Sequence, residues 1–126
     1  MSKERLSLGK RGEDLAALHL QGSGYRILAR NFRGRCGEID IVAEERGTLV
    51  FVEVKARSGT AFGHPLEAVT PHKQQQLARA ALEYLARNDQ HHRPVRFDVV
   101  GVIIDDKLPP VLELVRDAFT LETGAG

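Results

Sequence analysis

Apolar positions recur with two different periods along the chain, and these periods divide it into helices and strands. Residues 7–21 carry Leu and Ala at helical spacing, and the sequence GSG that follows predicts the end of this helix. Thr70 and Pro71 are typical of the N-cap and first position of a second helix, which extends to Arg87. Alternating or largely apolar stretches predict strands at 25–33, 38–45, 48–57, 95–104 and 111–115.

The order of these elements is α-β-β-β-α-β-β, which predicts an α/β fold with one mixed sheet of four to five strands flanked by helices. The first three strands are expected to form an antiparallel meander, and the second helix then crosses over to the fourth strand. A length of 126 residues suits one domain, which we place at residues 1–120. Residues 121–126 are expected to form a frayed tail.

Residues 37–57 predict a β-hairpin around a two-residue Arg-Gly turn at 46–47. With this turn the numbers of facing residues sum to 93, so Asp40 is expected opposite Glu53. Like charges directly opposite each other are destabilising, so this pair calls for a cation. Lys55 lies two residues beyond Glu53 on the same face and can partly supply it. A divalent ion such as Mg²⁺ or Mn²⁺ suits two carboxylates together with carbonyl and water oxygens.

The two faces of this hairpin differ in polarity. Alternation assigns one face to the core, with Ile39, Ile41, Ala43, Val50, Val52 and Val54. The other face is apolar near the turn and charged away from it. The alternative to a metal site is a salt-bridged polar face, half exposed to water, in which Glu38 pairs with Lys55. In the preceding strand, alternation puts Tyr25, Ile27 and Ala29 on a shared face.

Charge is spread unevenly, although the net charge is only +1. Residues 1–35 carry eight Lys and Arg against three Asp and Glu, which suits a polyanionic partner. The alternative is a solvated helix and strand that happen to carry arginine. The candidate contacts to a nucleic-acid backbone are Arg30, Arg33, Arg35, Arg57 and Lys73. Asp98, an acid in an apolar strand, is instead expected to form a structural ion pair with Arg96 or another arginine.

Several function classes are disfavoured by composition. Cys36 is the only cysteine, which excludes an intramolecular disulfide and a Cys-rich zinc site. The first residues lack the apolar region of a signal peptide. No apolar run approaches the ~20 residues of a membrane span. We therefore expect a cytoplasmic protein that makes no contact with membranes.

The motifs of this chain, taken in order, resemble the bacterial YraN-like family, which is similar to archaeal Holliday junction resolvases. GEID and EVK, separated by twelve residues, resemble the signature of the PD-(D/E)xK nuclease superfamily. Ile39 stands where the broader superfamily has proline, a variation that the YraN-like and resolvase groups share. The matching segments cover nearly the whole chain: GKRGEDLAA (9–17), GYRILARNFR (24–33), GEIDIVA (37–43), LVFVEVKAR (49–57), VTPHK (69–73) and RFDVV (96–100).

The resemblance implies a restriction endonuclease-like core and a role for each matching residue. Asp40 and Glu53 would bind Mg²⁺ or Mn²⁺, helped by the main-chain carbonyl of Val54. Lys55 would orient or activate the attacking water and stabilise charge that develops on the phosphate. Glu13, from the first helix, would bind a second metal or orient a water.

The function expected from this resemblance is divalent-metal-dependent hydrolysis of phosphodiester bonds in DNA, including branched or structured DNA. A homodimer is compatible with it, because symmetric cutting of a four-way junction needs two sites. Two alternatives stay open. One is a nucleic-acid-binding protein that keeps the nuclease fold without cleaving, and intact Asp40, Glu53 and Lys55 argue against it. The other is a nuclease directed at RNA.

Overall fold

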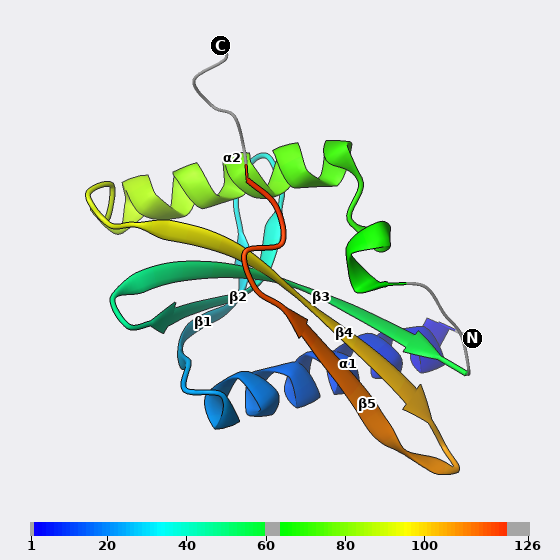
Figure 1. The fold of residues 1–126 in the computed structure, drawn as a ribbon. Coiled ribbons are helices and arrows are strands. Elements are labelled where there is room, and N and C mark those ends of the chain that lie inside the picture. Colours follow the sequence, from blue (N-terminus) through cyan, green and yellow to red (C-terminus); the bar gives the residue numbers. More distant parts are fainter. Residues whose placement is uncertain (1, 60–63, 121–126) are drawn as a thin grey trace.

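The computed structural model describes residues 2–59 and 64–120 of the chain (Figure 1). In chain order the elements are α1 (Ser2–Gly22), β1 (Arg26–Arg33), β2 (Glu38–Glu45), β3 (Thr48–Ser58), the short 3-10 helix η1 (Pro65–Ala68), α2 (Pro71–Arg87), β4 (Val95–Asp105) and β5 (Leu108–Val115). The predicted order is confirmed, while α1 begins earlier than expected and η1 is an addition. The tail expected at 121–126 lies outside the described residues. Neither described helix is long and apolar enough to cross a membrane.

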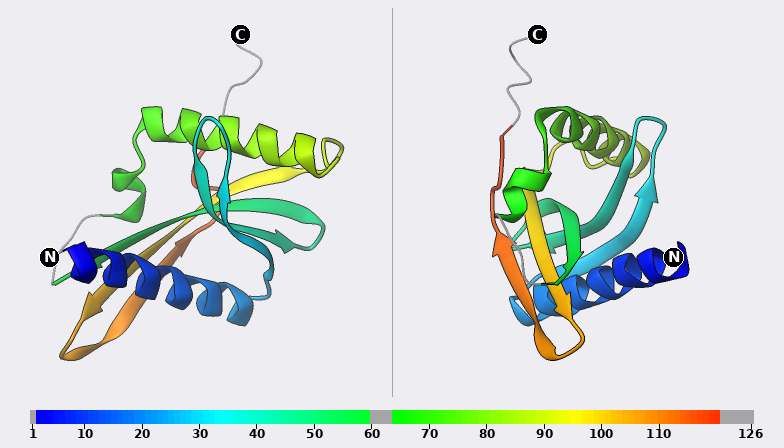
Figure 2. Two further views of the ribbon diagram at one scale, coloured as in Figure 1. Left: turned by 180° about the vertical axis from the view of Figure 1, so that it is seen from behind. Right: turned by 90° about the vertical axis from the view of Figure 1, so that its right-hand side faces the viewer.

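The strands form one sheet in the order β1-β2-β3-β4-β5. The pairs β1–β2, β2–β3 and β4–β5 are antiparallel, and β3–β4 is parallel because α2 crosses over between these two strands. The helices α1 and α2 cover opposite faces of the sheet (Figure 2). The expected α/β fold, a mixed sheet flanked by helices, is therefore confirmed.

Local sequence signals set the ends of both helices. The helix α1 ends in a Schellman motif, in which Gly24 has a φ of 96° and the Tyr25 N–H donates to the Leu20 carbonyl at 2.9 Å. The Thr70 side chain caps α2 by accepting a hydrogen bond from the Lys73 N–H at 3.2 Å. In each interaction the two partners are only a few residues apart in the chain, so the sequence alone is enough to predict both helix ends.

The β2–β3 hairpin follows the predicted register near its turn. The two turn residues at 46–47 have φ values of 51° and 87°, as a type I′ turn requires. Facing residues sum to 93 from the pair of Glu45 and Thr48 to the pair of Ile41 and Val52. The ladder between the two strands ends at that second pair.

Beyond the Ile41–Val52 pair, β2 and β3 are no longer paired with each other. We call the place where the two strands separate the fork. The strand β2 stays paired with β1, and β3 stays paired with β4 to its end. The Arg35 N–H donates to Glu83 on α2 at 2.7 Å, which ties the β1–β2 loop to α2 and leads β2 away from β3. The expected pairing of Glu38 with Lys55 is therefore wrong, and Glu38 lies 3.3 Å from Arg33 on β1 instead.

Both faces of the sheet are core, which corrects two of the alternation assignments. The face predicted to be core packs against α1 and includes Ile41, Ala43, Val50, Val52 and Val54. Ala29 and Ile39 lie instead in the cluster on the α2 face. A register shift between Ile27 and Ala29 places Ala29 on the α2 face of the sheet. Asn31 has a left-handed φ of 56° just before Phe32, and Ile39 is paired with Phe32 and lies with it in the cluster on the α2 face.

The second face of the hairpin is also buried near the turn. Val42, Leu49 and Phe51 pack there beneath α2 residues that include Ala81 and Leu85. The alternative of a salt-bridged face concerned the other end of this face, where Lys55 is ion-paired with Glu53. The charged end of the same face is the part that borders the fork.

The strand β5 is longer than predicted. It begins at Leu108 and includes Pro109 and Pro110, whereas the sequence indicated a start at 111. Because β5 is an edge strand, proline there need not donate a ladder hydrogen bond. The two prolines therefore do not end this edge strand, although the sequence pattern predicted that the strand would begin after them.

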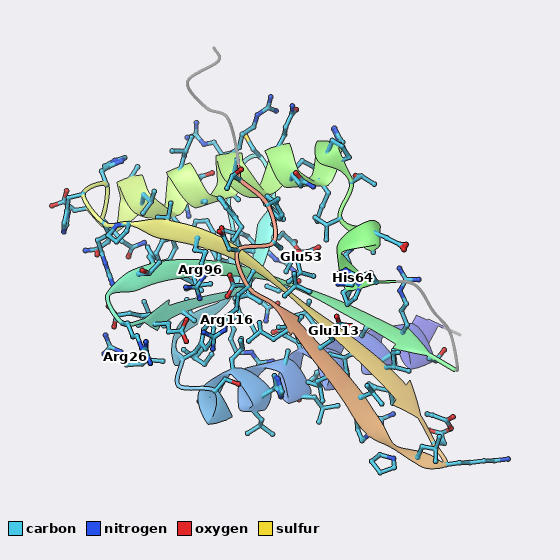
Figure 3. All side chains as sticks on the ribbon, in the orientation of Figure 1. Arg26, Glu53, His64, Arg96, Glu113 and Arg116 are labelled. Atoms are coloured by element: carbon cyan, nitrogen blue, oxygen red, sulfur yellow. The ribbon has the colours of Figure 1, made fainter. Side chains whose placement is uncertain are left out.

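The expected ion pair of Asp98 is confirmed, and it belongs to a larger network. Asp98 is 1% exposed and accepts hydrogen bonds from Arg96 Nε at 2.9 Å and from Tyr25 Oη at 2.6 Å. Arg96 also reaches Glu45 at 2.7 Å, and Arg116 lies 3.0 Å from the same carboxylate (Figure 3). The network joins the loop between α1 and β1 to β2, to β4 and to the segment after β5.

Candidate active site

Asp40 stands where β2 leaves β3. Its Oδ2 accepts a hydrogen bond from the Val54 N–H at 2.8 Å, so the side chain replaces the ladder bond that is lost at the fork. The N–H and C=O of a residue in an extended strand point to the same side, so the Val54 carbonyl also faces the fork. The fork thus presents a carboxylate and a main-chain oxygen next to each other.

Glu53 is the second acid of the site, and its side chain is only 5% exposed. Lys55 Nζ lies 3.3 Å from Glu53 Oε2, as the shared face of β3 predicts. Lys73 Nζ, from the first turn of α2, lies 3.6 Å from the same oxygen. The structure therefore brings a lysine from another element to the acidic pair.

The pKa of Asp40 is raised from its ordinary value of 3.8 to about 7. Burial is the main cause, and the negative charge of Glu53 and a side-chain hydrogen bond with it raise the pKa further. The Val54 N–H and the charge of Lys73 oppose this rise. A half-buried acid and a buried acid that share a site in this way are stabilised by positive charge.

This raised pKa predicts how stability depends on pH in the metal-free protein. Between the unfolded pKa near 4 and the folded pKa near 7, the folded protein holds a proton that the unfolded chain has released, so stability falls as pH rises. Asp40→Asn cannot ionise, yet it can accept from Val54 and donate to Glu53. From pH 5 to pH 8, the free energy of unfolding of Asp40→Asn should therefore rise by about 2 to 3 kcal/mol relative to that of the wild type.

Urea unfolding of both proteins in EDTA, at pH 5 and pH 8, measures this difference. A constant difference between the variant and the wild type at the two pH values would contradict the raised pKa of Asp40.

Glu13 reaches the site from α1. It lines a pocket of about 340 Å³ whose other residues are Leu8, Gly9, Asp40, Val54, Lys55 and Ala56. Arg30 Nε and Asn31 Nδ2 donate to Glu13 Oε1 at 3.0 and 2.9 Å. The Arg30 ion pair ends on the same oxygen, and among the described residues none makes a hydrogen bond or ion pair with Oε2.

The close approach of α1 to β3 depends on Gly12. A Cβ placed on Gly12 would lie 2.5 Å from the Cβ of Ala56, which no real pair of atoms tolerates. The absence of a side chain at position 12 therefore allows α1 to lie this close to β3. Gly12 thus sets the depth at which the neighbouring Glu13 enters the pocket.

We expect Gly12→Ala to lower the free energy of unfolding by about 1 to 3 kcal/mol, because the methyl group pushes α1 away from β3. Gly9→Ala is the matched control, since a Cβ there meets no atom within 4 Å. This second change should stabilise α1 by up to about 1 kcal/mol, the usual helix preference for Ala over Gly. Chemical unfolding of both variants measures the contrast, and equal stabilisation would contradict the close approach.

The residues expected to contact nucleic acid lie in different surroundings. Arg30 is engaged by Glu13 and Asp14, at 2.9 and 2.6 Å, so it holds α1 on β1. Arg33 is exposed and paired with Glu38, and Lys73 lies at the acidic pair. The exposed side chains of Arg35 and Arg57 make no ion pair with any residue that the structure describes.

Sequence reasoning missed Asn31 and the second role of Arg30. Asn31 combines a left-handed φ with a hydrogen bond to Glu13, and asparagine is one of the few residues that adopt this conformation readily. An asparagine inside an alternating strand was the available signal. The engagement of Arg30 with α1 had no local signal, because its partners lie 16 and 17 residues earlier.

The donor set at the fork suits a hard divalent ion. Asp40 and Glu53 offer carboxylate oxygens and Val54 a carbonyl oxygen, the ligand types that Mg²⁺ and Mn²⁺ prefer. Within the described ranges, no group of three or more His, Cys, Asp or Glu is close enough to hold a metal. Such an ion would therefore keep water or substrate oxygens among its ligands.

The fold and the site together define an α/β protein whose five-stranded mixed sheet carries a half-buried acid, Asp40, and a buried acid, Glu53, at a fork. A model of the uncharacterised protein family UPF0102 matches residues 12–102, and the chain belongs to this family. This is the YraN-like family that the motifs indicated.

Three relatives, each called a UPF0102 protein, illustrate the similarity. The protein of Geotalea daltonii is 50% identical over 115 residues, which are 91% of each chain. That of Rhodococcus opacus is 49% identical over 114 residues, 90% of this chain and 97% of its own. That of Geobacter sulfurreducens is 50% identical over 114 residues, 90% of this chain and 89% of its own.

Proposed function

We propose that this protein is a divalent-metal-dependent nuclease that hydrolyses phosphodiester bonds in DNA. One observation carries the proposal: two acids, Asp40 and Glu53, are held together at the fork with Lys55 beside them. Keeping two acids at a buried site is destabilising unless a cation or a proton joins them. Acids placed in this way are typical of functional sites.

Each residue of the site has a task that its position supports. A divalent ion held by Asp40, Glu53 and Val54 would neutralise phosphate oxygens and lower the pKa of a bound water. Lys55 would place a positive charge against the phosphate as negative charge develops. Glu13, with Oε1 fixed by its hydrogen bonds, offers Oε2 to a water or to the substrate.

Exposed cations flank the site on two strands of the sheet. Arg57 follows Lys55 by two residues on β3, and Arg33 is exposed at the end of β1. Arginine suits the backbone phosphates of nucleic acid, and contacts of this kind position a substrate without reading its sequence. These residues support a nucleic-acid substrate, and Arg30 is left out of the set because α1 engages it.

The test is a calorimetric titration of Mn²⁺ into the wild type and Glu53→Gln. Binding to the wild type that is lost in the variant is the expected result, and it needs no knowledge of the substrate. Binding to neither protein, also in the presence of a short DNA duplex, would reject the metal site. Mn²⁺ binding without cleavage of any DNA or RNA would favour a nucleic-acid-binding protein instead.

A further inference from the structure

Two lysines converge on one oxygen of Glu53. Lys55 Nζ lies 3.3 Å and Lys73 Nζ 3.6 Å from Oε2. Because Glu53 is almost fully buried, water solvates its charge poorly and the carboxylate depends on these cations. The charge of Lys73 also lowers the pKa of Asp40, so this second ammonium group acts on both acids of the pair.

Lys73 occupies a position that its own helix disfavours. It lies in the first turn of α2, where its N–H is bound by the Thr70 cap. A cation in this turn opposes the helix dipole, and the turn contains no acidic residue that would offset it. The acid that offsets the charge is Glu53, which comes from β3 and not from the helix.

The two lysines reach Glu53 from different elements, and both side chains are partly exposed. Lys55 follows Glu53 by two residues on the same strand face, so their side chains stay adjacent. Lys73 approaches from α2 through a flexible four-carbon side chain that is 34% exposed. The Lys73 ammonium can therefore move from Glu53 into solvent without any change in the backbone.

We propose that Lys73 is a built-in counter-ion of the acidic pair, which holds Glu53 in the metal-free protein and is displaced when a divalent cation binds. This inference rests on the proposed function, because it requires Asp40 and Glu53 to bind such a cation. The released ammonium group is then available to a phosphate of the nucleic acid. Binding of metal and binding of nucleic acid are thus coupled through one side chain.

Competition for a single oxygen has a measurable consequence. The wild type binds a divalent cation more weakly than the same site without Lys73, because the ion must displace one positive charge from Glu53. Lys55 also repels the ion, but it is present in both proteins, so their comparison isolates Lys73. If Lys73 only helped to build the metal site, its loss would weaken metal binding or leave it unchanged. Tighter binding after its loss is therefore specific to a competing counter-ion.

The experiment is calorimetric titration of Mn²⁺ into the wild type, Lys73→Met, Lys73→Arg and Lys107→Met. Lys73→Met keeps the apolar stem and should bind Mn²⁺ about three- to tenfold more tightly, the range of a partly exposed ion pair. Lys73→Arg keeps the charge and should resemble the wild type. Lys107→Met, in the β4–β5 turn, removes the same charge away from the site and should change nothing.

The outcomes separate this inference from the proposed function. Unchanged or weaker binding by Lys73→Met, with Mn²⁺ binding by the wild type that Glu53→Gln loses, would overturn the counter-ion role and leave the metal site standing. Equal tightening in Lys107→Met would assign the effect to net charge and also overturn it. Absence of Mn²⁺ binding in every protein would reject both the site and the inference.

A second readout follows the released ammonium group. With Ca²⁺ present, Lys73→Met should reduce the dependence of duplex DNA binding on salt by about one unit of slope, the value of one phosphate contact. In EDTA the same substitution should leave the slope unchanged, because Lys73 then stays at Glu53. Equal slopes for the two proteins under both conditions would overturn the phosphate contact.

Discussion

Asp40→Asn and Glu53→Gln are each expected to reduce phosphodiester cleavage by at least about a thousandfold. Each change removes one of the two acids that would hold the divalent ion at the fork, and positioning and electrostatics carry most of the acceleration in this chemistry. Initial rates on a labelled DNA duplex and on a four-way junction, with Mn²⁺ present, measure the loss. Far-UV circular dichroism should show the wild-type fold in both variants.

Glu38→Gln is the control for this prediction. Glu38 lies two residues before Asp40 on the same strand, but it is exposed and paired with Arg33. Loss of this carboxylate should leave the cleavage rate within about twofold of the wild-type rate, because surface ion pairs contribute little to stability. Full activity in Asp40→Asn and Glu53→Gln would refute the site, and an equal loss in Glu38→Gln would locate the effect in the strand rather than in the two acids.

Asp98→Ala is expected to lower the free energy of unfolding by about 3 to 5 kcal/mol, the effect of breaking a buried ion pair. The carboxylate accepts hydrogen bonds from Tyr25, from Arg96 and from the backbone N–H of Asp117 at 3.0 Å. Its removal leaves these donors partly buried and unpaired. Urea unfolding at pH 7 measures the loss.

Two further variants make this second prediction decisive. Asp98→Asn keeps an acceptor for Tyr25 and should lose less stability than Asp98→Ala, so it can be measured even where the alanine variant does not fold. Glu38→Ala removes an acid from an exposed pair and should change stability by about 1 kcal/mol or less. Equal losses in Asp98→Ala and Glu38→Ala would contradict the structural role of the network.

Much of the fold could be predicted because its signals are local. The glycine after α1, the Thr-Pro start of α2 and the Arg-Gly turn of the hairpin each act within a few residues. A turn of known length also sets the register near it, which holds from Thr48 to Val52. Periodicity then supplied the order of the elements and hence the α/β class.

The faces of the strands were less predictable. Simple alternation fails at Ala29, where β1 has a register shift, and at Ile39, whose partner on β1 follows the left-handed residue Asn31. Alternation left open whether the second side of the hairpin was half exposed to water, and the structure shows that α2 covers its apolar part near the turn. Which helix packs on which face is set by contacts between segments far apart in the chain.

The candidate site divides in the same way. The sequence placed Asp40, Glu53 and Lys55 on one hairpin, and the resemblance added Glu13 from the first helix. Only the tertiary structure brings Lys73 to Glu53. No spacing along the chain encodes this contact.

The sequence by itself determined the elements, their order, the turn register, the acidic pair and the family, because each of these rests on neighbouring residues or on ordered motifs. The tertiary structure decided where β2 leaves β3, how deeply Gly12 lets α1 approach, and that Arg30 binds α1. These features depend on packing between distant segments, where steric fit and buried charge act together. The raised pKa of Asp40 and the two cations at Glu53 arise from that packing.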